Sequence, residues 1–489
     1  MAAVMRMGMV LVALLVTGCG KGCGGKKSRK KRRNLRTERA EKEAIEAQNA
    51  MADRAEIERR GETPEDAPNI LLVSLDTLRA DGLDAYGGLP DNAPFLNKMA
   101  EEGVWFEYSY AQAPSTSPTH ASMFTSVLPS EHGIMGTDGR LPASFDTLAE
   151  YMQSYGIRTW AAASSVRFAV GVQLNQGFDE YAVFAQGSQM RKSDQAMEVA
   201  LAAIAAQPDR PWFGFLHLMD VHAPYNVKEP HQSRYLKGAP SVDPKETVRF
   251  LHKHRLDKDG VTAQQLTDLK AMYAGGVSHV DTRIAALLDA VRAIERPTLV
   301  VVTADHGEAF FEKNFLGHGT YVHEAIVRVP LVFWGPGLVP GGQKRSTLAQ
   351  SIDLFPTLMH FAQLPVPDGL RGADLYSVIQ GRGEQTGRSV VAQSRKWQML
   401  VRDTEDGVQK LVLTGKGRRP RLYDLASDPL EQTNLADAES AKVDQWSEQL
   451  MNVSFRAKRK ANGARTEQWE MSSEEREALE AIGYMDVAQ

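Results

Sequence analysis

The stretch NILLVSLD, residues 69–76, is a short and nearly continuous apolar run that ends in an acidic residue. Apolar side chains at consecutive positions are typical of a strand that is buried on both faces, as in parallel sheets. Runs of the same kind occupy residues 212–225, 298–308 and 329–337. These four segments predict the buried strands of one central sheet.

Helical patterns lie between the apolar runs, at residues 145–155, 193–206 and 266–294. The alternation of strands with helices predicts an α/β fold with a large, mainly parallel sheet that is flanked by helices. We expect this main domain to cover residues 69–378.

The sequence pattern changes from residue 379 onward. Residues 389–403 and 409–415 favour short antiparallel strands, and residues 421–436 are rich in turn-forming residues. A short amphipathic helix is predicted near the end, at residues 472–485. These features predict a smaller C-terminal α+β subdomain over residues 379–489.

The N-terminus is predicted to lie outside the fold. Residues 1–19 hold one basic residue, an apolar stretch and the sequence Val-Thr-Gly-Cys, which resembles a bacterial lipoprotein signal in which Cys19 is lipidated. An ordinary signal peptide that happens to hold a cysteine is the alternative. Residues 20–68 are charged and have almost no apolar stripe, so they predict a solvated tether. We expect a lipid-anchored protein on the periplasmic face of the cell envelope, with Gly20 favouring the outer membrane over the inner one.

Composition narrows the classes of function. The chain has 489 residues and a net charge of −4, so nothing indicates a general attraction to nucleic acid. Its only cysteines are Cys19 and Cys23, so the predicted fold contains neither a thiol nor a disulfide. The sequence gives no indication of the oligomeric state.

Polar clusters follow three of the predicted strands, at Asp76, at His217 to His222 and at Asp305-His306. In open α/β sheets, ligands bind beyond the carboxyl ends of the strands, so a site is expected there. Two carboxylates and one imidazole suit a divalent cation such as Zn²⁺ or Mn²⁺.

Several segments resemble, in their order along the chain, the sulfatase branch of the alkaline phosphatase superfamily. The resemblance spans residues 69–436 and rests on the segments NILLVSLDTLRADGLDAYG, TSPTHASMFTS, VVTADHGEAF, HGTYVHEAIVRVPLVFWGPG, SIDLFPTL and LYDLASDPLEQTNLA. It implies a hydrolase of sulfuric or phosphoric esters.

The resemblance also implies the position of the nucleophile. The family carries it in the pattern Cys/Ser-x-Pro-x-Arg, which here reads Thr-Ser-Pro-Thr-His over residues 116–120. Thr116 then stands at the nucleophile position, and His120 replaces the arginine. Threonine is not a known substrate for conversion to formylglycine, and the family's Gly-Lys-Trp-His stretch is also missing from residues 155–168. Direct attack by the threonine hydroxyl is therefore implied.

The other implied roles fall to residues near the strand ends. The implied metal ligands are Asp76, Thr116, Asp305 and His306, and because Thr77 replaces a family aspartate, Zn²⁺ or Mn²⁺ is favoured over Ca²⁺. His120 would hold non-bridging oxygens of the substrate and His222 would protonate the leaving oxygen. The implied substrate-binding residues are His318, Asp220 and His217. A second metal held by Asp220, His222 and His318 stays open, as in two-metal relatives.

The predicted reaction is in-line attack of Thr116 on a tetrahedral phosphorus or sulfur centre of a small-molecule, glycan or lipid ester. Two alternatives remain. An envelope transferase of the phosphoethanolamine type would pass the group to an acceptor hydroxyl, but such enzymes usually carry several membrane helices. A non-catalytic binding lipoprotein is the other, and the intact set of metal-binding residues argues against it.

Overall fold

The apolar run at residues 69–76 forms strand β1 (Asn69–Leu75), and all seven of its residues are buried. β1 pairs in parallel with β6 (Trp212–Leu218) on one side and with β7 (Thr298–Thr303) on the other. β4 (Arg158–Ala163) and β5 (Glu180–Val183) continue the parallel part of the sheet beyond β6. The predicted central sheet is confirmed, and β4 and β5 are strands beyond the four that were predicted.

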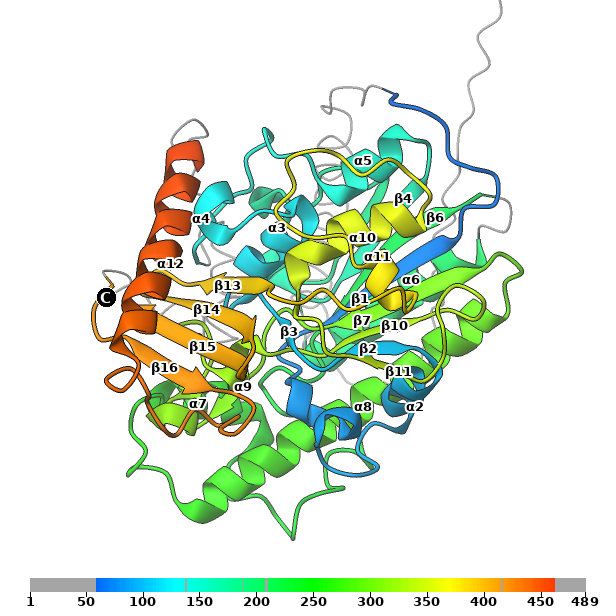
Figure 1. The fold of residues 1–489 in the computed structure, drawn as a ribbon. Coiled ribbons are helices and arrows are strands. Elements are labelled where there is room, and N and C mark those ends of the chain that lie inside the picture. The colour runs from blue at the N-terminus through cyan, green and yellow to red at the C-terminus, as the bar shows by residue number, and fades with distance from the viewer. Residues whose placement is uncertain (1–58, 137–138, 187, 207–209, 415–416, 462–489) are drawn as a thin grey trace, which may run out of the picture. The chain divides into compact units, whose positions relative to one another are not determined.

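A computed structural model describes residues 59–136, 139–186, 188–206, 210–414 and 417–461 (Figure 1). These residues belong to one compact unit. The predicted signal peptide with Cys19, residues 20–58 of the tether and the predicted helix at residues 472–485 lie outside the described residues.

The sheet has eight strands in the order β11-β2-β10-β7-β1-β6-β4-β5. β10 (Leu331–Trp334) is the fourth predicted strand, but it runs antiparallel to β7 and to β2 (Val104–Phe106). A parallel connection needs a long crossover, usually a helix. Between β7 and β10 the longest helix is α9 (Glu324–Val327), so the chain stays near the edge where β7 ended and enters β10 in the opposite direction. β11 (Gln343–Arg345) then pairs in parallel with β2.

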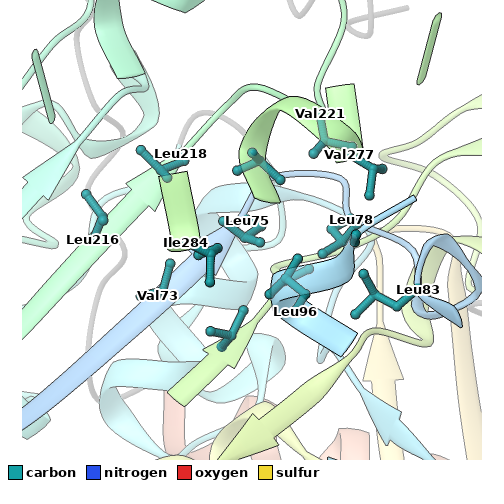
Figure 2. Close-up of a cluster of buried hydrophobic side chains, with 14 of the residues drawn as sticks. Val73, Leu75, Leu78, Leu83, Leu96, Leu216, Leu218, Val221, Val277 and Ile284 are labelled. Atoms are coloured by element: carbon teal, nitrogen blue, oxygen red, sulfur yellow. The ribbon is translucent and has the colours of Figure 1, made fainter. Parts of the chain in front are cut away.

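Helices cover both faces of this sheet. On one face lie α2 (Pro94–Glu102), α6 (Gln189–Ala205) and the long α8 (Ala263–Arg292). Alternate residues of β1 and β6 point toward this face, where Val73 and Leu75 pack near Ile284 of α8 (Figure 2).

The opposite face carries α3 (Thr116–Thr125), α5 (Leu148–Ser154) and α10 (Leu354–Phe361), which pack against the remaining β1 side chains Ile70 and Leu72. The predicted helices at residues 145–155, 193–206 and 266–294 correspond to α5, α6 and α8. Burial of side chains on both faces of β1 explains why its sequence is continuously apolar rather than alternating.

The C-terminal part is a separate antiparallel sheet, in the order β13-β14-β15-β16. β13 (Ser389–Gln393), β14 (Trp397–Thr404) and β15 (Gly407–Thr414) confirm the predicted strands. Two elements of this C-terminal part were not predicted. β16 (Arg421–Asp424) lies in the segment taken as turns, and the helix α12 (Ser440–Ala461) packs on this sheet through residues that include Trp446. In the described part of the chain, no helix combines the length and apolar character that crossing a bilayer requires.

Candidate active site at the carboxyl edge of the sheet

The carboxyl ends of β1 and β7 bring two acidic residues together. Asp76 follows β1, and Asp305 follows β7. The backbone N–H groups of Thr77 and His306 both donate to Asp305 Oδ1, over 3.3 and 2.9 Å. Thr77 has a φ of 61°, an unfavourable left-handed conformation for a β-branched residue. Such strained residues cluster at functional sites. Here the strained turn after β1 is hydrogen-bonded to Asp305, which follows β7.

Asp76, Asp305 and His306 have the arrangement that a metal ion requires. One ligand atom from each lies within 4.8 Å of the others. His306 Nε2 is 3.7 Å from Asp76 Oδ1 and 3.5 Å from Asp305 Oδ2. Among the described residues, neither of these buried carboxylate oxygens has a hydrogen-bond partner. Because buried charged oxygens are costly to leave unsatisfied, the donor set fits a divalent cation.

The imidazole of His306 is held in the tautomer that metal binding requires. Its Nδ1 donates to Gly307 O over 3.0 Å, which leaves the Nε2 lone pair directed at the two carboxylates. Burial alone would lower the pKa of His306, but the charges of Asp305 and Asp76 outweigh burial and raise it. A positive charge is thus favoured at this point between the two acids.

Thr116 joins the same cluster from a different element. It is the first residue of α3, is buried, and its Oγ1 lies 3.4 Å from His306 Nε2. The N-terminus of a helix carries free N–H groups and a positive partial charge, which stabilise an oxyanion. The predicted nucleophile therefore lies beside the predicted metal ligands.

His120 lies in the site region, but its contacts do not fit the expected contact with substrate oxygens. Its Nδ1 donates to Thr116 O over 2.8 Å, and its Nε2 accepts from Ser74 Oγ over 2.9 Å. Its ring packs edge-on against Phe168 and Phe215. Burial lowers the pKa of His120 to about 3, so the ring is neutral. In this arrangement His120 supports the first turn of α3 instead of facing a ligand.

His217 lies against Asp76 at the carboxyl edge of the sheet. Its Nε2 is 3.2 Å from Asp76 Oδ2, and it forms a second group of possible ligands with His120 and Asp305. Burial lowers its pKa to about 4. His217 therefore lies next to the carboxylates of Asp76 and Asp305.

His222 and His318 face each other beside His306. Their ring centroids are 5.1 Å apart, and those of His306 and His318 are 4.4 Å apart. His222 Nδ1 donates to Ala223 O, and burial lowers its pKa to about 4. Burial, followed by the charge of His306, holds the pKa of His318 well below its usual value. Two neutral imidazoles thus border the candidate metal ligands.

Asp220 is directed away from these imidazoles, toward α8. Its Oδ1 accepts from His279 Nδ1 over 2.8 Å and from Arg283 Nε over 2.7 Å. Within the described ranges, Asp220, His222 and His318 are not among the groups of ligand atoms that lie within 4.8 Å of one another. The second metal site considered from the sequence is therefore not formed by this trio, because α8 holds its carboxylate.

Glu308 is a further residue beside His318 that the sequence analysis did not single out. It is fully buried, its Oε1 accepts from His318 Nδ1 over 2.9 Å, and its Oε2 accepts from Tyr225 over 3.1 Å. Burial raises its pKa. The signal was present, since Glu308 closes the Asp-His-Gly-Glu segment after β7, but nothing in the segment indicates its distant partners.

Comparison with known proteins agrees with this site. The profile of the family described as Sulfatase matches residues 68–364, which is more than half of the chain. The chain belongs to the sulfatase family. A second profile, described as the C-terminal part of N-sulphoglucosamine sulphohydrolase, matches residues 307–456 of this sulfatase family member.

The individual relatives are distant in sequence, but the alignments cover most of each relative's length. The arylsulfatase of Clostridium perfringens is 23% identical over 454 residues, covering 77% of this chain and 91% of the relative. The choline-sulfatase of Rhizobium meliloti is 24% identical over 440 residues, covering 77% and 84%. The crystal structure of the phosphonate monoester hydrolase of Agrobacterium radiobacter aligns with a TM-score of 0.66 at 22% identity, covering 80% and 96%.

Membership of the family defines the general activity. The chain is an ester hydrolase of the sulfatase family, and it carries candidate metal-binding residues at the edge of the sheet. It differs from the family pattern at Thr116 and His120.

Proposed function

We propose that this sulfatase family member is a metal-dependent hydrolase of sulfate or phosphate esters, with Thr116 as its nucleophile and without formylglycine. The observation that carries the proposal is the position of Thr116 Oγ1, 3.4 Å from an imidazole that also faces two unsatisfied carboxylate oxygens. The chain offers no alternative through cysteine, because its only two cysteines lie at positions 19 and 23.

Asp76, Asp305, His306 and Thr116 would hold the divalent ion, with Zn²⁺ or Mn²⁺ favoured over Ca²⁺. When bound, the ion lowers the pKa of a coordinated hydroxyl and neutralises charge on the ester group. His217 lies close enough to Asp76 to fix the orientation of its carboxylate.

The covalent step is an in-line displacement. Thr116 Oγ gives its proton to solvent water and forms a bond to phosphorus or sulfur while the bond to the leaving oxygen breaks. The free N–H groups at the start of α3 stabilise the negative charge on Thr116 Oγ as it attacks. Water then attacks the threonyl ester, which releases sulfate or phosphate and restores the hydroxyl.

We assign protonation of the leaving oxygen to His222, in the substrate complex. Its pKa of about 4 leaves it neutral in the free enzyme, with its proton on Nδ1. A bound anionic ester places a negative charge nearby and raises the pKa of the imidazole, so that Nε2 can carry the proton that the leaving oxygen receives.

The names of the relatives point to a choice of substrates. The curated relatives include an arylsulfatase and a choline-sulfatase, and a structural relative is a phosphonate monoester hydrolase. We therefore propose turnover of an aryl or alkyl ester of sulfate, phosphate or phosphonate, which in the cell belongs to a small molecule, a glycan or a lipid.

Turnover of p-nitrophenyl sulfate, p-nitrophenyl phosphate and bis-p-nitrophenyl phosphate by purified, metal-analysed protein tests the proposal. We expect hydrolysis of at least one ester, loss of activity on dialysis against a chelator, and recovery with Zn²⁺ or Mn²⁺. Thr116→Ala should be inactive and Thr116→Ser partly active. Unchanged turnover in Thr116→Ala would exclude Thr116 as the nucleophile.

We also propose that Cys19 is lipidated and anchors the enzyme at the periplasmic face of the envelope, preferably at the outer membrane. The lipobox-like sequence before Cys19 and the charged segment at residues 20–68 support this location. Cys19→Ser should move the protein out of the membrane fraction and abolish its labelling by a radioactive fatty acid. Unchanged labelling in Cys19→Ser would contradict the proposal.

A further inference from the structure

Arg167 is buried beside the carboxyl edge of the sheet. It belongs to the 3₁₀ turn η3 (Val166–Phe168), which follows the carboxyl end of β4, and β4 is the direct neighbour of β6. The residue is only 1% exposed. A guanidinium removed from water is costly to maintain, so its position next to an active site indicates a role for the charge.

The loop that carries Arg167 is attached to the site on both sides of this residue. Before it, the backbone N–H and the hydroxyl of Ser164 both donate to His217 O, over 3.2 and 2.9 Å. After it, the ring of Phe168 packs against His217 and His120, with ring centroids 4.7 Å away in each case. The backbone of Arg167 is therefore fixed relative to the candidate metal ligands.

The loop of Arg167 reaches the candidate metal ligands through two imidazoles. His120 Nδ1 lies 3.9 Å from Asp305 Oδ2, and His217 Nε2 lies 3.2 Å from Asp76 Oδ2. Arg167 thus belongs to a loop that is one ring away from the candidate ligand carboxylates.

The site needs a cation in addition to the metal. Sulfate and phosphate esters carry negative charge on their non-bridging oxygens, whereas both ring nitrogens of His120 are already bonded, to Thr116 O and to Ser74 Oγ. A guanidinium, in contrast, stays charged and offers a planar fork of N–H donors that matches two oxygens of a tetrahedral oxyanion.

We propose that Arg167 is a catalytic residue that binds non-bridging oxygens of the ester group and stabilises their charge in the transition state, the role that sequence reasoning gave to His120. The inference rests on the proposed function. Arg167 lies within residues 155–168, the segment from which the Gly-Lys-Trp-His stretch of the family is missing.

The test combines anion binding with turnover. Affinity for inorganic phosphate and sulfate is measured by calorimetry on metal-reconstituted Thr116→Ala protein, with and without Arg167→Met, Arg167→Gln or Arg167→Lys. Turnover of p-nitrophenyl esters is measured for the same changes in the otherwise native chain. Arg345→Met is the matched control, because Arg345 is another buried arginine and donates to the backbone of Val378 and Ile379.

We expect Arg167→Met and Arg167→Gln to weaken anion binding at least tenfold and to lower kcat/KM by about 100- to 1,000-fold, with Arg167→Lys intermediate. Arg345→Met should keep the anion affinity and the kcat/KM of the parent. In a fourth variant, Arg167→Ala, added guanidinium ion should restore part of the activity. If Arg167→Met does not fold, the anion affinity and kcat/KM of Arg167→Gln, which keeps a long polar side chain, are compared with those of the parent.

Anion affinity and kcat/KM within twofold of the parent in a folded Arg167→Met or Arg167→Gln protein would overturn the inference. The proposed function fails separately. If Thr116→Ala keeps its turnover, the nucleophile is wrong whatever Arg167 does. If Thr116→Ala is inactive while Arg167→Met is fully active, only the role of Arg167 is wrong.

Discussion

Thr116 Oγ1 lies 3.4 Å from His306 Nε2, although the two residues are 190 positions apart in the sequence. The contact joins the start of α3 to the end of β7, two elements that the sheet brings to the same edge. It places a hydroxyl beside a donor set that is suited to a metal ion. The proposed chemistry of this enzyme depends on that contact.

Removing one of the two carboxylates should remove the metal. Asp305→Asn and Asp76→Asn each delete one negative charge from the donor set, so we expect metal affinity to fall by at least about 100-fold and activity to fall with it. Mass-spectrometric metal analysis of proteins dialysed in parallel checks this. Asp268→Asn is a suitable control, because Asp268 is bonded to Ser241 and Gln264. Full metal occupancy in Asp305→Asn would contradict the assignment.

Glu308 is predicted to act through His318. Glu308→Ala leaves His318 Nδ1 without its acceptor, so the ring orientation is lost and kcat/KM should fall by about 10- to 100-fold. Tyr225→Phe removes only the hydroxyl that donates to the other oxygen of Glu308, and its effect should be less than tenfold. The pH profile of kcat/KM should change in Glu308→Ala. A purely structural role would lower the melting temperature and leave the profile where it is.

His120 should contribute to stability more than to substrate binding. His120→Ala removes a buried ring that packs on Phe168 and holds Thr116 O, so we expect a loss of about 3 to 5 kcal/mol in the free energy of unfolding, by analogy with buried aromatic residues. Affinity for inorganic phosphate should change little in any folded fraction. A large loss of phosphate affinity without a loss of stability would restore the substrate-binding role expected from the sequence.

A buried ion cluster attaches the C-terminal sheet to the main domain. Lys410 Nζ of β15 lies 2.8 Å from Glu324 Oε1 of α9 and 2.9 Å from Glu431 Oε1. Lys410→Met leaves these carboxylates without their cation and should cost about 3 to 5 kcal/mol, measured by urea unfolding. Arg158→Met, which breaks an exposed pair with Glu180, should cost less than about 1 kcal/mol.

The same cluster predicts a dependence of stability on pH. Burial would raise the pKa of Glu431, but Lys410 and His323 outweigh it and lower the pKa to about 2, from an ordinary value of 4.5. The native state therefore binds fewer protons than the unfolded state between these values, so stability is present above pH 4.5 and is lost as the pH falls toward 2. Glu431→Gln should flatten this loss. An identical slope in both proteins would contradict the assigned pKa.

The sequence was sufficient for much of the fold because strands buried on both faces, such as β1, have a continuously apolar pattern. It did not reveal the direction of β10, which depends on the lack of a long crossover helix, or β16, which is only four residues long. The turn signals around β16 are stronger than its apolar pattern.

Asp76, Asp305 and His306 were predictable as candidate metal ligands because they lie within three residues of the carboxyl end of a strand, and strand ends meet at one edge of a parallel sheet. Thr116, at the start of α3, was placed only by the family resemblance. The contacts of His120 and Asp220 were not predictable, because they depend on the partners that these side chains find in the fold. Ser74 and Thr116 take both nitrogens of His120, and Asp220 is bonded to residues of α8. Arg167 carries no motif of its own, and its burial is visible only in the folded chain.

Identification of the covalent intermediate is the sharpest test of Thr116 as the nucleophile. Enzyme quenched in acid during turnover of a p-nitrophenyl ester is digested, and the peptide that spans residues 113–133 is fragmented in a mass spectrometer. We expect one phosphoryl or sulfuryl group on Thr116, and none on this peptide in Thr116→Ala. A group on Ser115, Ser117 or another side chain of a catalytically active protein would contradict it.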